Sequence, residues 1–147
     1  MALPSSSDSR IAEASTDADI ARCFAVMSQL RPHLREDAFV ARVRLQQAEG
    51  FRLVFLEDAG EVIATAGFRI IENLSAGRVL YVDDLVTDAR CRSNGYGARL
   101  LAWLADRARS EGCATLDLDS GVQRKDAHRF YHSRGMTMFA HHFRMGL

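Results

Sequence analysis

The sequence predicts an α+β protein with a mixed, mostly antiparallel sheet and helices on both faces. Three observations lead to this prediction. Apolar residues recur with a helical period before Gly50, and apolar runs separated by short turns follow that glycine. The second half then alternates helical and strand patterns, which is typical of β-α-β units. Hairpins followed by β-α-β units predict the element order β-αα-β-β-β-α-β-α-β.

The first predicted elements are a short strand over residues 10–15 and a pair of helices. Thr16 or Asp17 caps the first helix, which Pro32 ends. The second helix covers about residues 36–49 and stops at the glycine that follows.

The middle of the chain predicts three strands joined by two short turns, so that they form consecutive hairpins. A helix, a strand, a second helix and a final strand or short hairpin follow. In chain order, these elements cover residues 51–58, 61–71, 78–87, 96–110, 114–119, 124–134 and 136–145. Gly135 stops the last helix.

The chain has 147 residues, and we expect a single domain over residues 10–147 after a Ser-rich, disordered lead-in at residues 1–9. Lys plus Arg and Asp plus Glu both total 19, and this balance argues against a nucleic-acid-binding surface. The apolar runs are too short for a membrane span, which needs about 20 residues. The chain has three cysteines, and no two of them form a C-x-x-C motif. We therefore expect no disulfide framework and a location in the reducing cytoplasm.

Residues 91–97 read CRSNGYG and lie between an apolar strand and a helical pattern. The N–H groups at a helix N-terminus have no partners within the helix, and glycines let them approach an anion closely. Arg92 and Arg90 add positive charge, and Asn94 is the predicted helix cap. The stretch is a candidate pyrophosphate cradle. The alternative is a plain strand–helix turn that uses glycine for its geometry.

Two other nucleotide-binding motifs fit this turn poorly. A P-loop requires lysine where Ala98 stands. A dinucleotide-binding fold requires a third glycine where Leu100 stands. A metal site is not expected either, because His128 and His132 flank Arg129 where the H-E-x-x-H motif has glutamate.

The turn resembles the acetyl-CoA motif of the GNAT family of N-acetyltransferases. The family pattern reads L-x-V-x-P-x-x-R-x-x-G-x-G before a helix, and its places are taken here by Leu85, Thr87, Ala89, Arg92, Gly95 and Gly97. The later stretch AHRFYHSRGM is similar to the family's A-x-x-F-Y-x-x-x-G-F helix. Three positions depart from the family: Ala89 replaces proline, Met136 replaces phenylalanine, and Arg124 stands where asparagine is common.

The resemblance implies a GNAT-type fold and the use of acetyl-CoA as acyl donor, without a metal. It assigns main-chain contacts with the pantetheine arm to a splayed strand end, and N–H contacts with the pyrophosphate to the turn. In chain order, the implied binding residues are Leu85, Val86, Thr87, Arg92, Ser93, Asn94, Gly95, Tyr96, Gly97, Ala98, Arg124 and Ala127.

Three side chains are candidates for catalysis. Asp83 and Asp84 interrupt an apolar strand, and the resemblance implies that one of them deprotonates an amine, commonly through water. Neighbours on a strand point to opposite faces, so we expect the two to have separate roles. The alternative is that an aspartate caps a bulge or pairs with an arginine. Tyr131 resembles the tyrosine that protonates the CoA thiolate, and its alternative role is that of an ordinary core aromatic.

The sequence does not identify the acceptor, because variable loops form the walls of the acceptor pocket. The candidates are a small amine, an antibiotic, an amino acid and a protein N-terminus or lysine. An acyl group longer than acetyl is open too. The resemblance is compatible with a homodimer and implies no nucleic-acid or membrane partner. The rival function is that of a non-catalytic module that binds acyl-CoA and senses or regulates.

Overall fold

The computed structural model describes residues 9–147. The chain divides into two compact units, of which the first ends at Asp117 and the second runs from Leu118 to Leu147. The predicted lead-in lies, except for Ser9, outside the described residues. The assignment of residues 10–147 to one domain stays a prediction.

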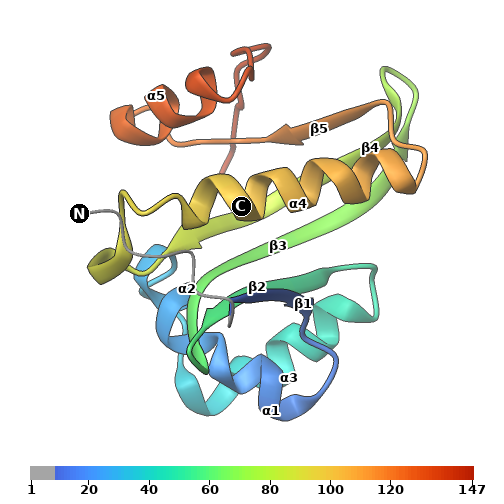
Figure 1. Cartoon of the computed structure of the whole chain (residues 1–147). Helices are drawn as coiled ribbons and strands as arrows, with labels where there is room; N and C mark the ends of the chain where they lie inside the picture. The colour runs from blue at the N-terminus through green and yellow to red at the C-terminus, as the bar shows by residue number, and fades with distance from the viewer. Residues whose placement is uncertain (1–8) are drawn as a thin grey trace. The chain divides into compact units, whose positions relative to one another are not determined.

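Five strands form one sheet, and their order in space follows their order in the chain (Figure 1). The strands are β1 (Arg10–Glu13), β2 (Arg52–Asp58), β3 (Glu61–Asn73), β4 (Gly77–Thr87) and β5 (Thr115–Leu118). The first four are joined by antiparallel pairing. The predicted α+β class with a mixed, mostly antiparallel sheet is therefore confirmed.

The first predicted helix is in fact two short helices, α1 (Asp17–Arg22) and α2 (Phe24–Leu30). Thr16 caps α1 as predicted, and its hydroxyl accepts the N–H of Asp19 at 3.1 Å. The break lies at Cys23, whose N–H bonds to a carbonyl three residues back and whose buried thiol donates to the Asp19 carbonyl at 3.3 Å. A tighter turn around a buried thiol thus makes the break, and hydrophobic periodicity does not reveal such a turn.

Helices cover both faces of the sheet, as predicted. The helices α1, α2 and α3 (Glu36–Gln47) lie together on one side, and α4 (Tyr96–Ser110) lies on the other (Figure 1). The core under the first three helices includes the fully buried Phe55. On the α4 side, the rings of Phe68 and Trp103 meet edge to face with their centroids 6.1 Å apart.

The second unit contains α5 (Lys125–Ser133), where the sequence predicts a helix. The prediction of a final strand or short hairpin over residues 136–145 is wrong, because the chain has no regular secondary structure from residue 136 to its end. The side chains of Phe139 and Phe143 are exposed there. A strand requires a hydrogen-bonded neighbour, and an apolar sequence alone supplies none.

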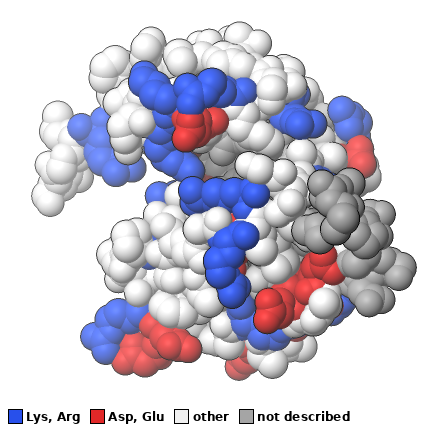
Figure 2. Space-filling view, turned by 60° about the vertical axis from the view of Figure 1, so that its left-hand side comes forward, with Lys and Arg blue, Asp and Glu red and all other residues white. Residues whose placement is uncertain are grey.

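Among the described residues, no helix combines the length and the apolar character that crossing a bilayer requires. Figure 2 shows basic and acidic side chains next to one another on one face of the molecule, in keeping with a formal net charge of zero. The cytoplasmic location and the absence of a nucleic-acid partner stay predictions.

Candidate active site

A β-bulge lies in the middle of β4, where the two aspartates interrupt the apolar strand. Gly67 of β3 is paired with Asp84, whereas the next residue, Phe68, is paired with Val82. Asp83 is therefore the extra residue of the bulge. A bulge bends a strand, increases its twist and redirects its side chains, and such features are common beside active sites.

Gly67 is the residue that lets the bulge form at this place. A Cβ at position 67 would lie 2.3 Å from the ring of Phe51 and 2.9 Å from Oδ2 of Asp84. Real Cβ atoms do not come so close to other atoms, so any larger residue would displace the aromatic ring or the carboxylate. The glycine therefore keeps room for the Asp84 carboxylate against the sheet.

Both aspartate side chains lie on the same face of the sheet, and the expectation of opposite faces is wrong. Asp84 lies beside Gly67, and Asp83 accepts from Nε of Arg69 at 2.9 Å. Gly67 and Arg69 are two residues apart on β3 and so face the same side. Arg31 donates through Nε to Asp84 at 2.8 Å and through a terminal nitrogen to the Asp83 carbonyl at 3.0 Å. The extra residue of the bulge breaks the alternation that the prediction assumed.

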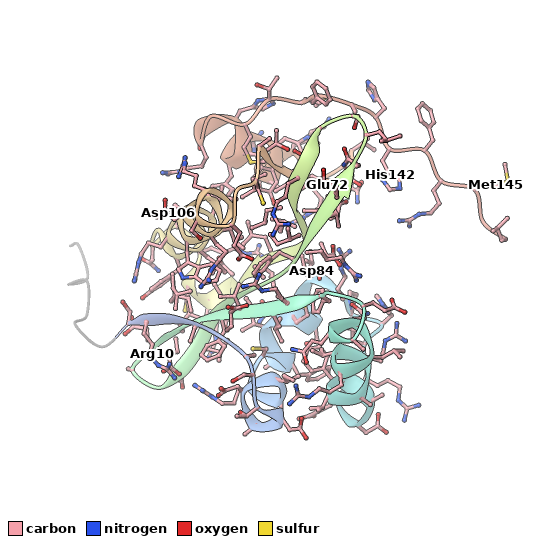
Figure 3. The ribbon with its side chains drawn as sticks, turned by 90° about the vertical axis from the view of Figure 1, so that its right-hand side faces the viewer. Arg10, Glu72, Asp84, Asp106, His142 and Met145 are labelled. Carbon is pink, nitrogen blue, oxygen red and sulfur yellow. The ribbon has the colours of Figure 1, made fainter. Side chains whose placement is uncertain are left out.

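Asp84 lies in the middle of the sheet (Figure 3), and its surroundings act on its charge in opposite directions. Burial has the largest effect and raises the pKa of this carboxyl above its ordinary value. The hydrogen bond and charge of Arg31 counteract that rise, while the nearby charge of Asp83 adds to it. Asp84 thus has a higher proton affinity than an exposed aspartate.

The loop between β4 and α4, which we call the cradle (residues 88–98), has the backbone of an anion site. After the short 3₁₀ helix Ala89–Cys91, Ser93 and Gly95 adopt left-handed conformations, with φ of 69° and 82°. Gly95 is the N-cap of α4 and gives it no side-chain hydrogen bond. The prediction that Asn94 caps the helix is wrong, since its amide donates to a backbone carbonyl of the loop at 3.1 Å. The N–H groups of the first turn of α4 therefore remain available to an anion.

Two hydrogen bonds anchor the start of the cradle to the rest of the first unit. The N–H of Asp88 donates to the Ile63 carbonyl of β3 at 2.7 Å. The next N–H, that of Ala89, donates to Oε1 of Gln29 in α2 at 2.9 Å. The loop is thus attached to both the sheet and the α2 helix, which limits its freedom before any ligand binds.

The two arginines of the cradle differ in their pairing. Arg90 forms an ion pair of 2.8 Å with Asp88. The hydrogen bonds from the Arg90 side chain and backbone N–H lower the pKa of Asp88 to about 2. The charge of Arg90 is therefore compensated within the loop. No carboxylate pairs with Arg92 anywhere in residues 9–147, so Arg92 is the cradle's uncompensated cation.

Tyr96 attaches the first turn of α4 to the end of β2. Its hydroxyl donates to Oδ2 of Asp58, at the end of β2, at 2.8 Å. That hydrogen bond raises the pKa of the Tyr96 phenol, which therefore stays protonated as the donor. The helix end that bears the free N–H groups is thereby held against the β2–β3 hairpin.

The end of β4 lies past the point that β5 reaches. The N–H of Ala114, directly before β5, donates to the Arg78 carbonyl near the start of β4 at 2.8 Å. β5 is only four residues long and runs in the same direction as β4 (Figure 1). On one edge, the segment from Leu85 to Thr87 is paired with β3. That the other edge of this segment is open to a ligand stays a prediction.

The remaining predicted residues lie in the second unit. Arg124 is the N-cap of α5, and Ala127 and Tyr131 are on that helix. Burial raises the pKa of the Tyr131 phenol, so Tyr131 keeps its proton at neutral pH. Their assignment to one site with the aspartates stays a prediction. No group of three or more His, Cys, Asp or Glu in residues 9–147 is arranged to hold a metal ion, and His128 instead contacts the Gly121 carbonyl at 2.8 Å.

Sequence reasoning missed four residues that shape this site: Gly67, Arg69, Gln29 and Asp58. A glycine inside a strand pattern is a signal of a bulge or a close approach, so Gly67 could have been found. The other three act through partners far along the chain, such as the 60-residue separation between Gln29 and Ala89. No local pattern in the sequence predicts such pairs.

Comparison with known proteins identifies the family. The model of the acetyltransferase (GNAT) family matches residues 18–136. The uncharacterized N-acetyltransferase YhdJ of Bacillus subtilis is 38% identical over 126 residues, which are 84% of this chain and 89% of that protein. The aminoalkylphosphonate N-acetyltransferase of Salmonella typhimurium is 29% identical over 123 residues, which are 83% of this chain and 77% of that protein. A solved aminoglycoside N-acetyltransferase in complex with CoA superposes with a TM-score of 0.80 at 17% identity, covering 97% of this chain and 98% of that one.

The matched range contains the bulge of β4, the cradle and α5, so it includes every element to which the sequence assigned a function. The match also covers well over half of the chain. The chain therefore belongs to the GNAT family of acetyltransferases.

Proposed function

We propose that this protein transfers the acetyl group of acetyl-CoA directly to the amine of an acceptor. The observation that carries the proposal is the position of the cradle. It follows β4 directly, so the predicted open strand edge, a helix N-terminus and the half-buried Asp84 all lie on one continuous stretch of chain. These are the groups that a pantetheine arm, a pyrophosphate and an amine require.

Acetyl-CoA is held chiefly by main-chain groups in this proposal. The edge of Leu85, Val86 and Thr87 pairs with the amides of the pantetheine arm. The N–H groups of residues 92–98 and the side chain of Arg92 bind the pyrophosphate, because a helix N-terminus favours negative charge. Arg124 and Ala127 of α5 complete the donor site. No metal takes part in this binding.

The aspartates of the bulge prepare the acceptor amine. A primary amine with a pKa of about 10 is protonated at neutral pH and cannot attack. Asp84, or Asp83 through water, accepts one proton of the ammonium group, and the nitrogen lone pair that this frees then bonds to the thioester carbonyl carbon. The raised pKa of Asp84 favours it over Asp83, whose side chain is more exposed, at 22% against 15%.

Tyr131 supplies the second proton in this scheme. The carbon–sulfur bond breaks as the tetrahedral intermediate collapses, and the phenol donates its proton to the departing thiolate. The nitrogen loses a second proton, to water, as the amide forms. Of the two protons taken from the nitrogen, one returns through solvent to the Tyr131 phenolate and the other is released to solvent, so the reaction is balanced. The burial that raises the Tyr131 pKa keeps the donor loaded between turnovers.

A small-molecule acceptor is the version we favour. One relative is named for an aminoalkylphosphonate, a small amine, and matches 83% of this chain. We expect an acetyl donor and a protein that works in the cytoplasm. A homodimer is compatible with the proposal and is not required by it.

The cradle is tested with two glycine variants of equal backbone strain. Gly95→Ala and Gly112→Ala both place a Cβ at positive φ, with open space around it, at opposite ends of α4. Each loses roughly 1–2 kcal/mol of stability from that conformation. Calorimetry should show acetyl-CoA affinity reduced at least tenfold in Gly95→Ala and unchanged in Gly112→Ala. Equal affinities in the two variants would remove the cradle from the donor site.

Catalysis is tested with Tyr131→Phe, assayed by thiol release with a panel of amines. We expect acetyl-CoA affinity to persist while kcat falls about 100-fold, the usual contribution of a positioned acid. If wild-type protein binds acetyl-CoA but acetylates no amine of the panel, the non-catalytic acyl-CoA-binding module becomes the better description.

A further inference from the structure

Four charged side chains form a balanced cluster at the bulge. Asp83 is paired with Arg69 at 2.9 Å, and Asp84 is paired with Arg31 at 2.8 Å. The two carboxylates and two guanidinium groups carry no net charge together. Because the Asp83 and Asp84 side chains are only 22% and 15% exposed, these charges are poorly compensated by solvent.

This balance restricts which amine the site can accept. A simple alkylammonium ion would add one positive charge beside two guanidinium groups, without a free carboxylate to pair with. An acceptor that contains an anionic group as well as the ammonium group keeps the net charge of the cluster at zero. The anion can take a guanidinium group while the ammonium takes the carboxylate that is released, so every charge remains paired.

The two arginines are not equally free to change partners. Arg69 extends from the middle of β3, lies over the Phe51 ring at 5.4 Å and contacts Gln46 of α3 at 3.5 Å. Arg31 extends from the residue after α2, and its side chain is 44% exposed against 27% for Arg69. Arg31 is therefore the partner that can move.

We propose that the acceptor is a zwitterion, a small primary amine that carries a carboxylate, phosphonate or phosphate, and that Arg31 exchanges Asp84 for this anion. The exchange leaves Asp84 to the acceptor's ammonium group at the moment the acceptor binds. A guanidinium fork matches the oxygens of all three anions, which is why they form one class here. This inference rests on the proposed function, since it assigns the acceptor of the same site.

Matched acceptors test the inference. The pairs are 2-aminoethylphosphonate against its diethyl ester, and β-alanine against its methyl ester. Each pair keeps the amine and the carbon chain, and esterification removes the anionic charge. We expect kcat/KM to be at least tenfold higher for the anionic member. In Arg31→Met this preference should disappear, and in Arg31→Lys part of it should return. Arg35→Met is the control, because Arg35 is exposed, lies between α2 and α3 like Arg31, and pairs with Asp37 of α3.

Equal kcat/KM values within each pair, or an equal loss for both members in Arg31→Met, would overturn the inference. Binding of the same four compounds to the protein without acetyl-CoA, measured by calorimetry, gives a separate readout. Tighter binding of the anionic members that depends on Arg31 supports the inference even where no acetylation occurs, and in that case the proposed function alone fails. No difference in binding, or no binding of either member, contradicts the inference directly.

Discussion

The hydroxyl of Tyr96 donates a 2.8 Å hydrogen bond to Asp58, and this contact joins the N-terminus of α4 to the β2–β3 hairpin. Tyr96→Phe removes that bond and keeps the ring. A neutral-to-charged hydrogen bond contributes about 1.5–3 kcal/mol at most. We therefore expect KM for acetyl-CoA to rise three- to tenfold, with a smaller change in kcat and none in KM for the acceptor. An equal rise in both KM values would show a general loss of structure instead.

Arg31 should set the lower pH limit of the reaction. Burial raises the pKa of Asp84 and Arg31 lowers it, so Arg31→Met raises that pKa further. Asp83 and Arg69 remain beside Asp84, and their opposite effects stay in place. The carboxylate then protonates at a higher pH, and the acidic limb of the kcat/KM profile moves upward. Carboxyl NMR of the variant measures the same shift independently of turnover, and an unmoved resonance contradicts the prediction.

Gly67→Ala should damage both stability and activity. The added Cβ meets the Phe51 ring and the Asp84 carboxylate, and overpacking of this kind costs about 1–3 kcal/mol of unfolding free energy. Denaturant unfolding measures the loss, and thiol release measures the activity. The double variant Gly67→Ala, Phe51→Leu makes room at the ring and should recover part of the stability. Full stability of the single variant would show that the bulge tolerates a side chain.

The three cysteines should react with a thiol reagent at very different rates. Cys23 is fully buried, and burial raises the pKa of its thiol to about 12, so it should react only after unfolding. Cys91 and Cys113 are half-buried and should react in the native protein. Acetyl-CoA should slow the modification of Cys91, which lies in the cradle, and leave Cys113 unaffected. Equal protection of both would place the donor elsewhere.

The local parts of the fold could be predicted because they depend on neighbouring residues. The Thr16 cap and the span of α4 from Tyr96 to Ser110 each follow from a short pattern. The break at Cys23 and the missing final strand could not be predicted, because burial of a thiol and the supply of a strand partner are properties of the folded chain.

In the candidate site, too, the features that depend on neighbouring residues could be predicted, and those that depend on strand register could not. The sequence identified Asp83, Asp84 and the cradle, but it placed the aspartates on opposite faces. Their true arrangement depends on the register between β3 and β4, where one inserted residue changes the face of a side chain. Arg69 could not be assigned without that register, since it meets Asp83 across the sheet.

The end of the α2 helix connects the proposed binding sites of the acceptor and of acetyl-CoA, so it couples the affinities for the two ligands. Gln29, near its end, bonds to the cradle, and Arg31, two residues later, bonds to Asp84. A shift of this helix end on acceptor binding therefore also moves a support of the donor site. Such linkage is reciprocal: whatever factor the acceptor adds to the affinity for acetyl-CoA, acetyl-CoA must add to the affinity for the acceptor.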